Sequence, residues 1–173
     1  CNNSAATMTS LSDITAINFG NLSNTSTCTT TGAGASLLNK YSDYSAVVPA
    51  QDLYTGTIQN FNITVSDCGG VSSGAFIKIF IDYNRNGQFT DPGEEAYASS
   101  AAQAGTFTEN GSIYVPTYAS AGVVKMRVIV SNTTNVLSIL PCGNYTNGET
   151  EDYLINIKTT PAYTYSYVWN PGA

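Results

Sequence analysis

The chain contains the stretch FIDYNRNGQFTDPGEEAY at residues 80–97, where an apolar segment runs directly into a loop rich in side-chain oxygens. Upstream of this loop, Ile77, Ile79 and Ile81 fall on one face of an extended chain, because successive side chains of a strand point to opposite faces. The opposite face is also mostly apolar, which is typical of a strand in the middle of a sheet. The sequence therefore predicts a central β-strand over residues 75–83, followed after the loop by a strand over residues 95–99.

The loop between these strands carries an oxygen-bearing side chain at every second position, in the order D-x-N-x-N-G from residue 82. This spacing wraps a chain around a calcium ion, and the glycine at position 87 permits the sharp turn that the wrapping needs. Calcium is therefore the predicted cofactor. The predicted ligands are Asp82, Asn84, Asn86, the backbone carbonyl of Gln88, Asp91 and Glu94, with Glu95 as a further acid.

The loop differs from an EF-hand, whose twelfth position carries a bidentate glutamate. Here the twelfth position is Gly93, and Glu94 follows one place later. Only one carboxylate occurs among the first three ligand positions, so we expect an acid from elsewhere to complete the site. Glu151 and Asp152, in the acidic segment GETEDY at residues 148–153, are the predicted donors. In the alternative interpretation, the Asn-Gly pair of the loop only forms a hairpin turn with solvated acids around it.

Short alternating apolar runs recur along the chain, separated by stretches rich in Ser, Thr, Asn and Gly. This pattern predicts an all-β fold, an antiparallel β-sandwich of the jelly-roll or immunoglobulin-like kind. Arg127 lies in one of these runs and is either a bidentate partner of the acids near Asp152 or a surface cation. The other predicted strands cover residues 14–19, 52–59, 61–66, 106–115, 123–131, 152–158 and 163–168.

Residues 81–97, 123–130 and 141–157 read IDYNRNGQFTDPGEEAY, VVKMRVIV and PCGNYTNGETEDYLINI. Together they resemble the GEVED domain of secreted and surface proteins of Bacteroidetes-type bacteria, and the segments at residues 14–28 and 41–45 resemble its N-terminal half. The name of the family corresponds here to residues 148–152, with Thr in place of Val. The resemblance implies a non-catalytic β-sandwich module of the kind appended to secreted proteases, adhesins and repeat-rich surface proteins.

The composition agrees with an exported protein. At 173 residues and 42% hydrophobic content, the chain is long enough for one domain with a core. Charged residues make up only 10%, as expected of a secreted all-β protein, and a net charge of −6 argues against nucleic acid or an anionic membrane surface as partner. No apolar run approaches the length of a membrane span and no signal-peptide pattern opens the chain, so the sequence reads as a mature or excised segment.

Four cysteines, Cys1, Cys28, Cys68 and Cys142, allow three disulfide connectivities. We favour Cys1–Cys28 with Cys68–Cys142, because the first pair would tie down the N-terminal arm and the second would join two strand ends. Disulfides predict an extracellular location, including the bacterial cell surface. In an alternative, Cys1 carries a lipid, as at the mature end of a bacterial lipoprotein. A metal site at the cysteines is disfavoured, since the chain has no C-x-x-C pair and no histidine.

Catalysis is not predicted. The absence of histidine excludes Ser-His-Asp and Cys-His arrangements. A glycosidase-like pair of Glu94 with Glu151 is a poor candidate, since carboxylates neutralised by a bound cation are poor general acids. Some tyrosines are instead candidates for stacking on sugars or on protein partners, namely Tyr41, Tyr44, Tyr114 and Tyr118.

The C-terminal segment after the predicted domain of residues 1–159 alternates aromatic with polar or apolar residues, which predicts an extra strand. Residues 160–173 therefore form a separate tail, which docks on its own domain, begins a further repeat or adds to a sheet of a neighbouring subunit. Addition to a neighbour is a head-to-tail contact, and contacts of this kind generate filaments. The predicted assembly residues are Tyr163, Tyr165, Tyr167 and Trp169.

Two functions follow from these observations. The first is a calcium-stabilised extracellular structural or adhesive module, a subunit of a cell-surface filament or a domain of a large adhesin, whose partners are copies of itself or neighbouring domains of the same polypeptide. The alternative is an accessory domain of a secreted enzyme that binds surface polysaccharide or protein. Sequons would carry glycans only in a host with the matching transferase, and they include Asn21, Asn62, Asn110, Asn132 and Asn144.

Overall fold

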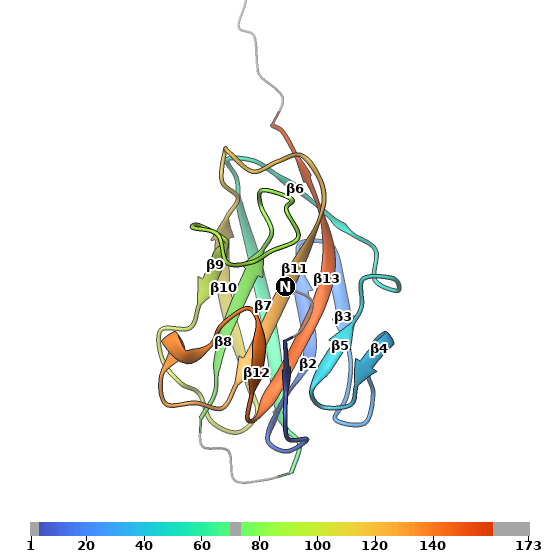
Figure 1. The fold of residues 1–173 in the computed structure, drawn as a ribbon, viewed down its shortest axis with the longest axis vertical. Helices are drawn as coiled ribbons and strands as arrows, with labels where there is room; N and C mark the ends of the chain where they lie inside the picture. Colours follow the sequence, from blue (N-terminus) through green and yellow to red (C-terminus); the bar gives the residue numbers. More distant parts are fainter. Residues whose placement is uncertain (1–3, 70–73, 161–173) are drawn as a thin grey trace, which may run out of the picture.

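Two β-sheets pack face to face in the computed structural model, which describes residues 4–69 and 74–160 (Figure 1). The larger sheet has the order β4 (Ala33–Leu37), β5 (Tyr41–Asp43), β13 (Gly148–Lys158), β11 (Gly122–Ser131), β8 (Phe76–Ile81) and β9 (Glu95–Ala98), with β6 (Gln51–Tyr54) also paired to β13. The smaller sheet has the order β10 (Phe107–Tyr114), β7 (Ile58–Asp67), β2 (Ser12–Phe19) and β3 (Leu22–Thr25). A separate pair joins β1 (Ser4–Ala6) and β12 (Gly143–Tyr145). The predicted all-β sandwich is therefore confirmed.

Most neighbouring strands are antiparallel, as predicted, but three pairs are parallel. Both β5 and β6 run parallel to β13, and β1 runs parallel to β12. The prediction of a purely antiparallel fold is wrong at these places, because short segments of the N-terminal half lie beside strands from the C-terminal end. The long strand β13 thus has β11 on one side and the two short strands on the other.

Several strands differ from their predicted limits. The predicted strand over residues 52–59 is interrupted after β6, because Gly56 turns the chain with a φ of 75° before β7 begins. The acidic segment at residues 148–152, expected before a strand, is the beginning of β13 itself. Five short strands were not predicted, since three to five residues show little periodicity. They are β1, β3, β4, β5 and β12.

The apolar core lies between the two sheets. Ile77, Ile79 and Ile81 of β8 are fully buried there against residues of β2, β7, β11 and β13. A second cluster covers the outer face of the larger sheet and consists of Phe80, Phe89, Ile129 and Ile139, next to the short helix η1 (Val136–Ser138). The strand β8 is therefore apolar on both faces and lies inside the sheet, as predicted.

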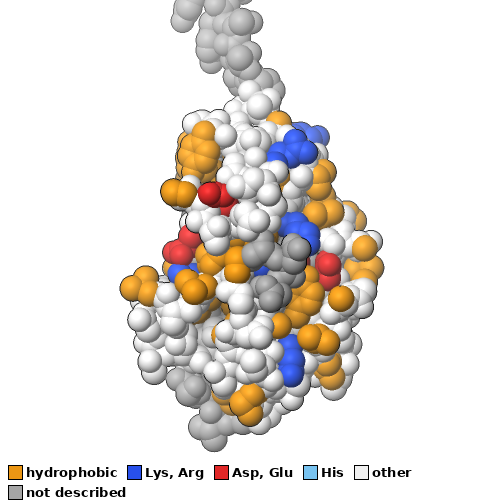
Figure 2. All heavy atoms as spheres, viewed as in Figure 1, with side chains coloured by type: hydrophobic (Ala, Val, Ile, Leu, Met, Phe, Trp, Pro, Cys, Tyr) orange, Lys and Arg blue, Asp and Glu red, His pale blue; other side chains and the backbone are white. Residues whose placement is uncertain are grey.

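The face seen in Figure 2 carries few charged side chains, which are scattered among uncharged ones.

No helix in the described part of the chain has the length and hydropathy needed to cross a membrane. The predicted strand over residues 163–168 and Cys1 lie outside the described residues. The predicted assembly residues lie outside them as well, namely Tyr163, Tyr165, Tyr167 and Trp169.

Candidate functional site

Asp82 is the first residue after β8, and the predicted calcium loop folds around its side chain, which is buried. The carboxylate accepts the backbone N–H groups of Asn86 at 3.0 Å and Gly87 at 2.9 Å. Gly87 has a φ of 80°, a left-handed conformation that favours glycine and turns the chain back toward Asp82. In Figure 1 this loop is the green segment beyond the end of β8.

Asp91 and Glu94 close the other side of the loop. Asn84 and Asn86 donate their side-chain amides to the carboxylate of Asp91 at 3.1 and 2.7 Å. The side chain of Glu94 is buried and accepts the backbone N–H groups of Asn84 at 3.4 Å and Asp91 at 3.3 Å. The structure therefore gathers five of the predicted ligands in one hydrogen-bonded loop: Asp82, Asn84, Asn86, Asp91 and Glu94.

The carboxylates of this loop lie close enough to affect one another electrostatically. Burial raises the pKa of Glu94, and the nearby charges of Asp82 and Asp91 raise it as well, against the lowering effect of its two backbone donors. Among the described residues, no Lys or Arg forms a salt bridge with any of the three acids. Acidic oxygens that approach one another without a cationic side chain form an environment in which a divalent cation is stabilised.

The other two predicted loop residues contribute differently. Gln88 is exposed, and its backbone N–H donates to the side-chain oxygen of Asn86 at 2.8 Å. Glu95 lies on β9 and forms a salt bridge of 2.7 Å with Lys78, which makes it unsuitable as a calcium ligand.

The structure does not bring Glu151 and Asp152 to the loop. Asp152 on β13 lies opposite Arg127 on β11, which in turn lies opposite Phe80 on β8. Two strand spacings, each about 4.8 Å, therefore separate Asp152 from Phe80. The side chains of both acids are buried and have partners within the sheet or the core.

Asp152 instead forms a bidentate ion pair with Arg127. The Nε and Nη2 atoms of Arg127 donate to the two carboxylate oxygens at 2.7 Å each, and both side chains are almost fully buried. This confirms one of the two predicted roles of Arg127 and shows that it is not a surface cation. The hydroxyl of Tyr41 donates to the same carboxylate at 3.0 Å.

Arg127 also contacts the calcium loop. Its guanidinium carbon lies 4.9 Å from the ring centroid of Phe89, a cation–π distance. Phe89 comes from the loop and is buried in the outer apolar cluster. Asp152 is thus linked to the loop through Arg127 and Phe89 rather than as a ligand. Phe89 was not predicted as a functional residue, although an apolar residue within a polar loop is a sign of anchoring.

Glu149 and Glu151 point into the core between the sheets, where charged groups are costly. Glu149 accepts the backbone N–H of Ile14 at 3.0 Å and the hydroxyl of Ser42 at 2.8 Å. Glu151 accepts the hydroxyl of Tyr153 at 2.8 Å. Burial raises the pKa of Glu149, and the charge of Glu151 raises it further. These acids therefore favour their protonated forms, and they act as parts of the interior rather than as ligands of the loop.

We predict that this interior acidic pair makes the protein less stable as the pH rises. Burial raises the pKa of Glu151 to about 8, above the ordinary value of 4.5. The folded protein then keeps a proton that the unfolded chain releases, so the stabilisation is complete below about pH 4.5 and is lost as the pH rises through about 8. The expected slope is at most about 1.4 kcal/mol per pH unit for one group.

Urea unfolding at several pH values in saturating calcium measures this slope. Glu151→Gln cannot ionise and should reduce the slope, with Glu149 left to contribute the remainder, whereas Asp67→Asn removes a carboxylate outside the interior and should leave the slope unchanged. Equal slopes for the wild type and the Glu151→Gln variant would contradict the prediction.

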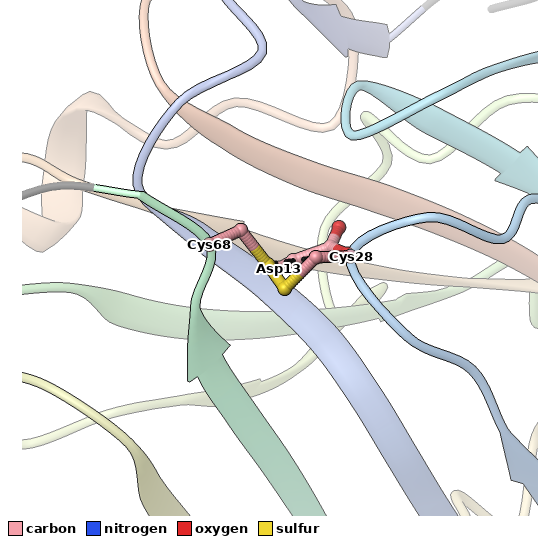
Figure 3. Close-up of side chains that lie close together, drawn as sticks. All are labelled: Asp13, Cys28 and Cys68. Atoms are coloured by element: carbon pink, nitrogen blue, oxygen red, sulfur yellow. Dashed lines mark hydrogen bonds between the residues drawn. A yellow bond between two sulfur atoms is a disulfide. The ribbon is translucent and has the colours of Figure 1, made fainter.

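A disulfide joins Cys28 to Cys68, with a Cα–Cα distance of 5.5 Å. The favoured pairing of Cys1–Cys28 with Cys68–Cys142 is therefore wrong, because it separates these two residues. The reason is that Cys28 follows β3 and Cys68 follows β7, and the fold brings these two segments together beside Asp13 of β2, as Figure 3 shows. Cys142 also belongs to a disulfide.

Asp13, Cys28 and Cys68 form a group whose oxygen and sulfur atoms all lie within 4.8 Å of one another (Figure 3). Among the described residues it is the one group of Asp, Glu or Cys with three ligand atoms this close. The carboxylate oxygens of Asp82, Asp91 and Glu94 lie further apart, so they would have to move toward one another to bind a shared ion. Thiolates are the metal-binding form of cysteine, and the disulfide removes them. The geometry could hold a metal ion only in the reduced protein.

The tyrosines considered for sugar stacking fall into two groups. Tyr44 is buried and stacks on Tyr153 with ring centroids 5.4 Å apart, and Tyr41 is bonded to Asp152, so these two are structural. Tyr114 and Tyr118 are 54% and 65% exposed.

Comparisons with known proteins give one family and several distant solved structures, of which two are given below. A search of curated proteins finds no match. The CARDB domain of a Pyrococcus furiosus protein, in complex with di-metal ions, has a TM-score of 0.42 at 8% identity, covering 90% of this chain and 100% of that chain. The GspB Siglec domain has a TM-score of 0.36 at 18% identity, covering 66% of this chain and 56% of that chain. The GEVED domain model matches residues 76–156, from β8 into β13. The resemblance predicted from the sequence is therefore confirmed over residues 76–156, which match the model of the GEVED domain.

Proposed function

We propose that this chain is a calcium-stabilised, non-catalytic structural or adhesive module that works outside the cell. The loop between β8 and β9 is the observation that carries the proposal, because Asp82, Asp91 and Glu94 converge there and no Lys or Arg of the described residues forms a salt bridge with them. The extracellular location is supported by the disulfide between Cys28 and Cys68.

Calcium would be held by oxygens that the loop already orients. Asp82 and Glu94 are fixed by backbone N–H groups, so their free lone pairs can face an ion. Asn84 and Asn86, which now donate to Asp91, would turn their amide oxygens inward, and the backbone carbonyl of Gln88 would add a further ligand. The ion would neutralise the acids of the loop and fix the loop against the sheet.

We predict that calcium raises the melting temperature and that Asp82→Ala abolishes the increase. A ligand at about 100 times its Kd stabilises a protein by about 2.7 kcal/mol, which for a chain of this size is roughly 5–10 °C. Melting curves in calcium and in EDTA measure the difference, with calorimetric titration as a direct test of binding. Asp67→Asn, which lies outside the loop, should keep the full increase. If the wild type melts at the same temperature in calcium and in EDTA, the loop is only a turn and does not bind calcium.

The structural or adhesive role is tested by the chain as a whole. We propose that residues 1–159 form the module and that residues 160–173 act as a tail that contacts a neighbouring subunit or domain, through Tyr163, Tyr165, Tyr167 and Trp169. Negative-stain electron microscopy in calcium compares the full chain with a version ending at Thr160. Filaments that vanish on truncation support a structural subunit. Dispersed particles from both would favour the alternative, an accessory domain that binds polysaccharide or protein.

A further inference from the structure

A cleft of about 460 Å³ lies in the smaller sheet, on strands that do not carry the calcium loop. Its polar lining comes from three adjacent strands and consists of Asn18 of β2, Gln59, Asn60 and Asn62 of β7, and Asn110 of β10. We propose that this cleft, here called the asparagine cleft, binds a neutral carbohydrate. The proposal goes beyond the calcium-stabilised module and does not depend on calcium binding.

The asparagines of the cleft form a row across the sheet. Asn18 lies opposite Asn62 in the pairing of β2 with β7, and Asn62 lies opposite Asn110 in the pairing of β7 with β10. Side chains directly opposite one another in antiparallel strands have Cβ atoms about 4.5–5.5 Å apart and share one face. The register therefore places three amide groups side by side, with Asn60 next to them on the same face of β7.

Hydrogen bonds within the sheet hold part of this row in place. The hydroxyl of Ser23 donates to the side-chain oxygen of Asn18 at 2.9 Å, and the amide nitrogen of Asn18 donates to the side-chain oxygen of Asn62 at 2.9 Å. The amide nitrogen of Asn62 and the whole amide of Asn60 make no side-chain hydrogen bond to any described residue. These groups remain available to a ligand, and Asn62, which is held through its carbonyl oxygen, loses less conformational freedom on binding than an unheld side chain.

The chemistry of the cleft matches hydroxyl groups. Asn60 offers N–H donors and a carbonyl acceptor, Asn62 offers its N–H donors, and a sugar hydroxyl both donates and accepts. Glu109, the acid closest in sequence to the lining residues, points to the core side of β10 and is buried. The protein also carries a net charge of −6, which repels acidic sugars. Neutral saccharides are therefore the ligand class that the asparagine cleft selects.

One end of the same face provides an apolar platform. Tyr114 of β10 lies opposite Ile58 of β7, and these side chains are 54% and 69% exposed. Both lie two residues further along the face than the pair of Ser112 and Asn60. An exposed aromatic ring beside polar groups suits a sugar ring, which has apolar C–H faces and polar edges. Tyr114 was predicted as a sugar-stacking candidate, and the register places it beside the cleft, opposite Ile58 and two residues beyond the level of Asn60.

The test uses the full chain produced in a host without N-glycosylation, because Asn62 and Asn110 lie in sequons and a covalent glycan would fill the cleft. The probes are cellohexaose, maltohexaose, xylohexaose and mannohexaose as neutral saccharides, with an oligogalacturonate as the acidic one. Side-chain amide resonances in NMR spectra report binding. We expect at least one neutral saccharide, and not the oligogalacturonate, to shift the amide signals of Asn60 and Asn62.

Matched variants locate the binding on the cleft. The double variant Asn60→Ala with Asn62→Ala should weaken binding at least about 10-fold, since it removes several hydrogen bonds to the saccharide. Tyr114→Ala should weaken it as well, whereas Thr108→Ala, on the same face outside the cleft, should keep it within about twofold. Absence of any response to the neutral saccharides, equal binding of the oligogalacturonate, or unchanged binding by a folded double variant would each overturn the proposal.

Discussion

Asp152→Ala is expected to lower the free energy of unfolding by about 3–5 kcal/mol, because the substitution leaves the guanidinium of Arg127 buried without its anionic partner. Arg127 is 1% exposed and donates two hydrogen bonds of 2.7 Å to this carboxylate. The loss of one partner is costly because a buried charge cannot recover its hydration. Urea unfolding in saturating calcium measures the effect.

A second variant shows whether the ion pair is the cause. Arg127→Met combined with Asp152→Leu removes both charges and should recover most of the lost stability, since an apolar pair of similar volume often replaces a buried ion pair without cost. A double variant as unstable as Asp152→Ala would point to packing instead. A cost below about 1 kcal/mol for Asp152→Ala would contradict the prediction outright.

The same variants separate two roles for Asp152. In the structure Asp152 reaches the calcium loop through Arg127 and Phe89, so folded Asp152→Ala should bind calcium more weakly but still measurably. Asp82→Ala should abolish binding. Complete loss of calcium binding in a folded Asp152→Ala variant would make Asp152 a ligand after all.

Removal of the disulfide between Cys28 and Cys68 is expected to lower the free energy of unfolding by about 4 kcal/mol. The two cysteines are 40 residues apart, and a closed loop of this length restricts the unfolded chain by about that amount in the chain-entropy model. Cys28→Ala with Cys68→Ala leaves no unpaired thiol from this bridge. Urea midpoints of the oxidised wild type and the double variant give the difference.

Peptide mapping without reduction checks the pairing before the stability experiment. A cross-linked peptide pair containing Cys28 and Cys68 is expected. Recovery of Cys68 linked to Cys142 would restore the pairing favoured from the sequence. A double variant that unfolds within about 0.5 kcal/mol of the wild type would contradict the stabilising role of the bridge.

The sequence predicts the strands of the GEVED region well, because their apolar residues alternate over long runs. Both β8 and β11 appear where the alternation places them, and the pairing of Arg127 with an acid near residue 152 is confirmed. Local spacing also predicts that residues from Asp82 to Glu94 fold into one hydrogen-bonded loop, because these thirteen residues are consecutive in the chain, whereas the binding of calcium by this loop stays a prediction. These features depend on neighbours in sequence, which a pattern can report.

Features that depend on distant segments were harder to predict. The role of Glu151 was misjudged because acids usually lie at the surface, whereas alternation along β13 directs this one into the core. The disulfide could not be predicted, since it depends on β2 bringing the segment after β3 beside the end of β7. The asparagine cleft depends on the register of three strands, and the periodicity of a single sequence does not report which residues of different strands lie opposite one another.

The place of β13 in the larger sheet also determines when this protein can fold. Among the described residues β13 is the last strand in sequence, yet it lies inside the larger sheet, and β5, β6 and β11 all pair with it. A nascent or partly exported chain that stops before residue 148 leaves these three strands without their common partner, and unpaired strand edges invite aggregation. The larger sheet should therefore form in a single late step, after β13 has been synthesised or exported. A chain that crosses a membrane unfolded would gain from that delay, because its sandwich closes only once β13 is on the far side.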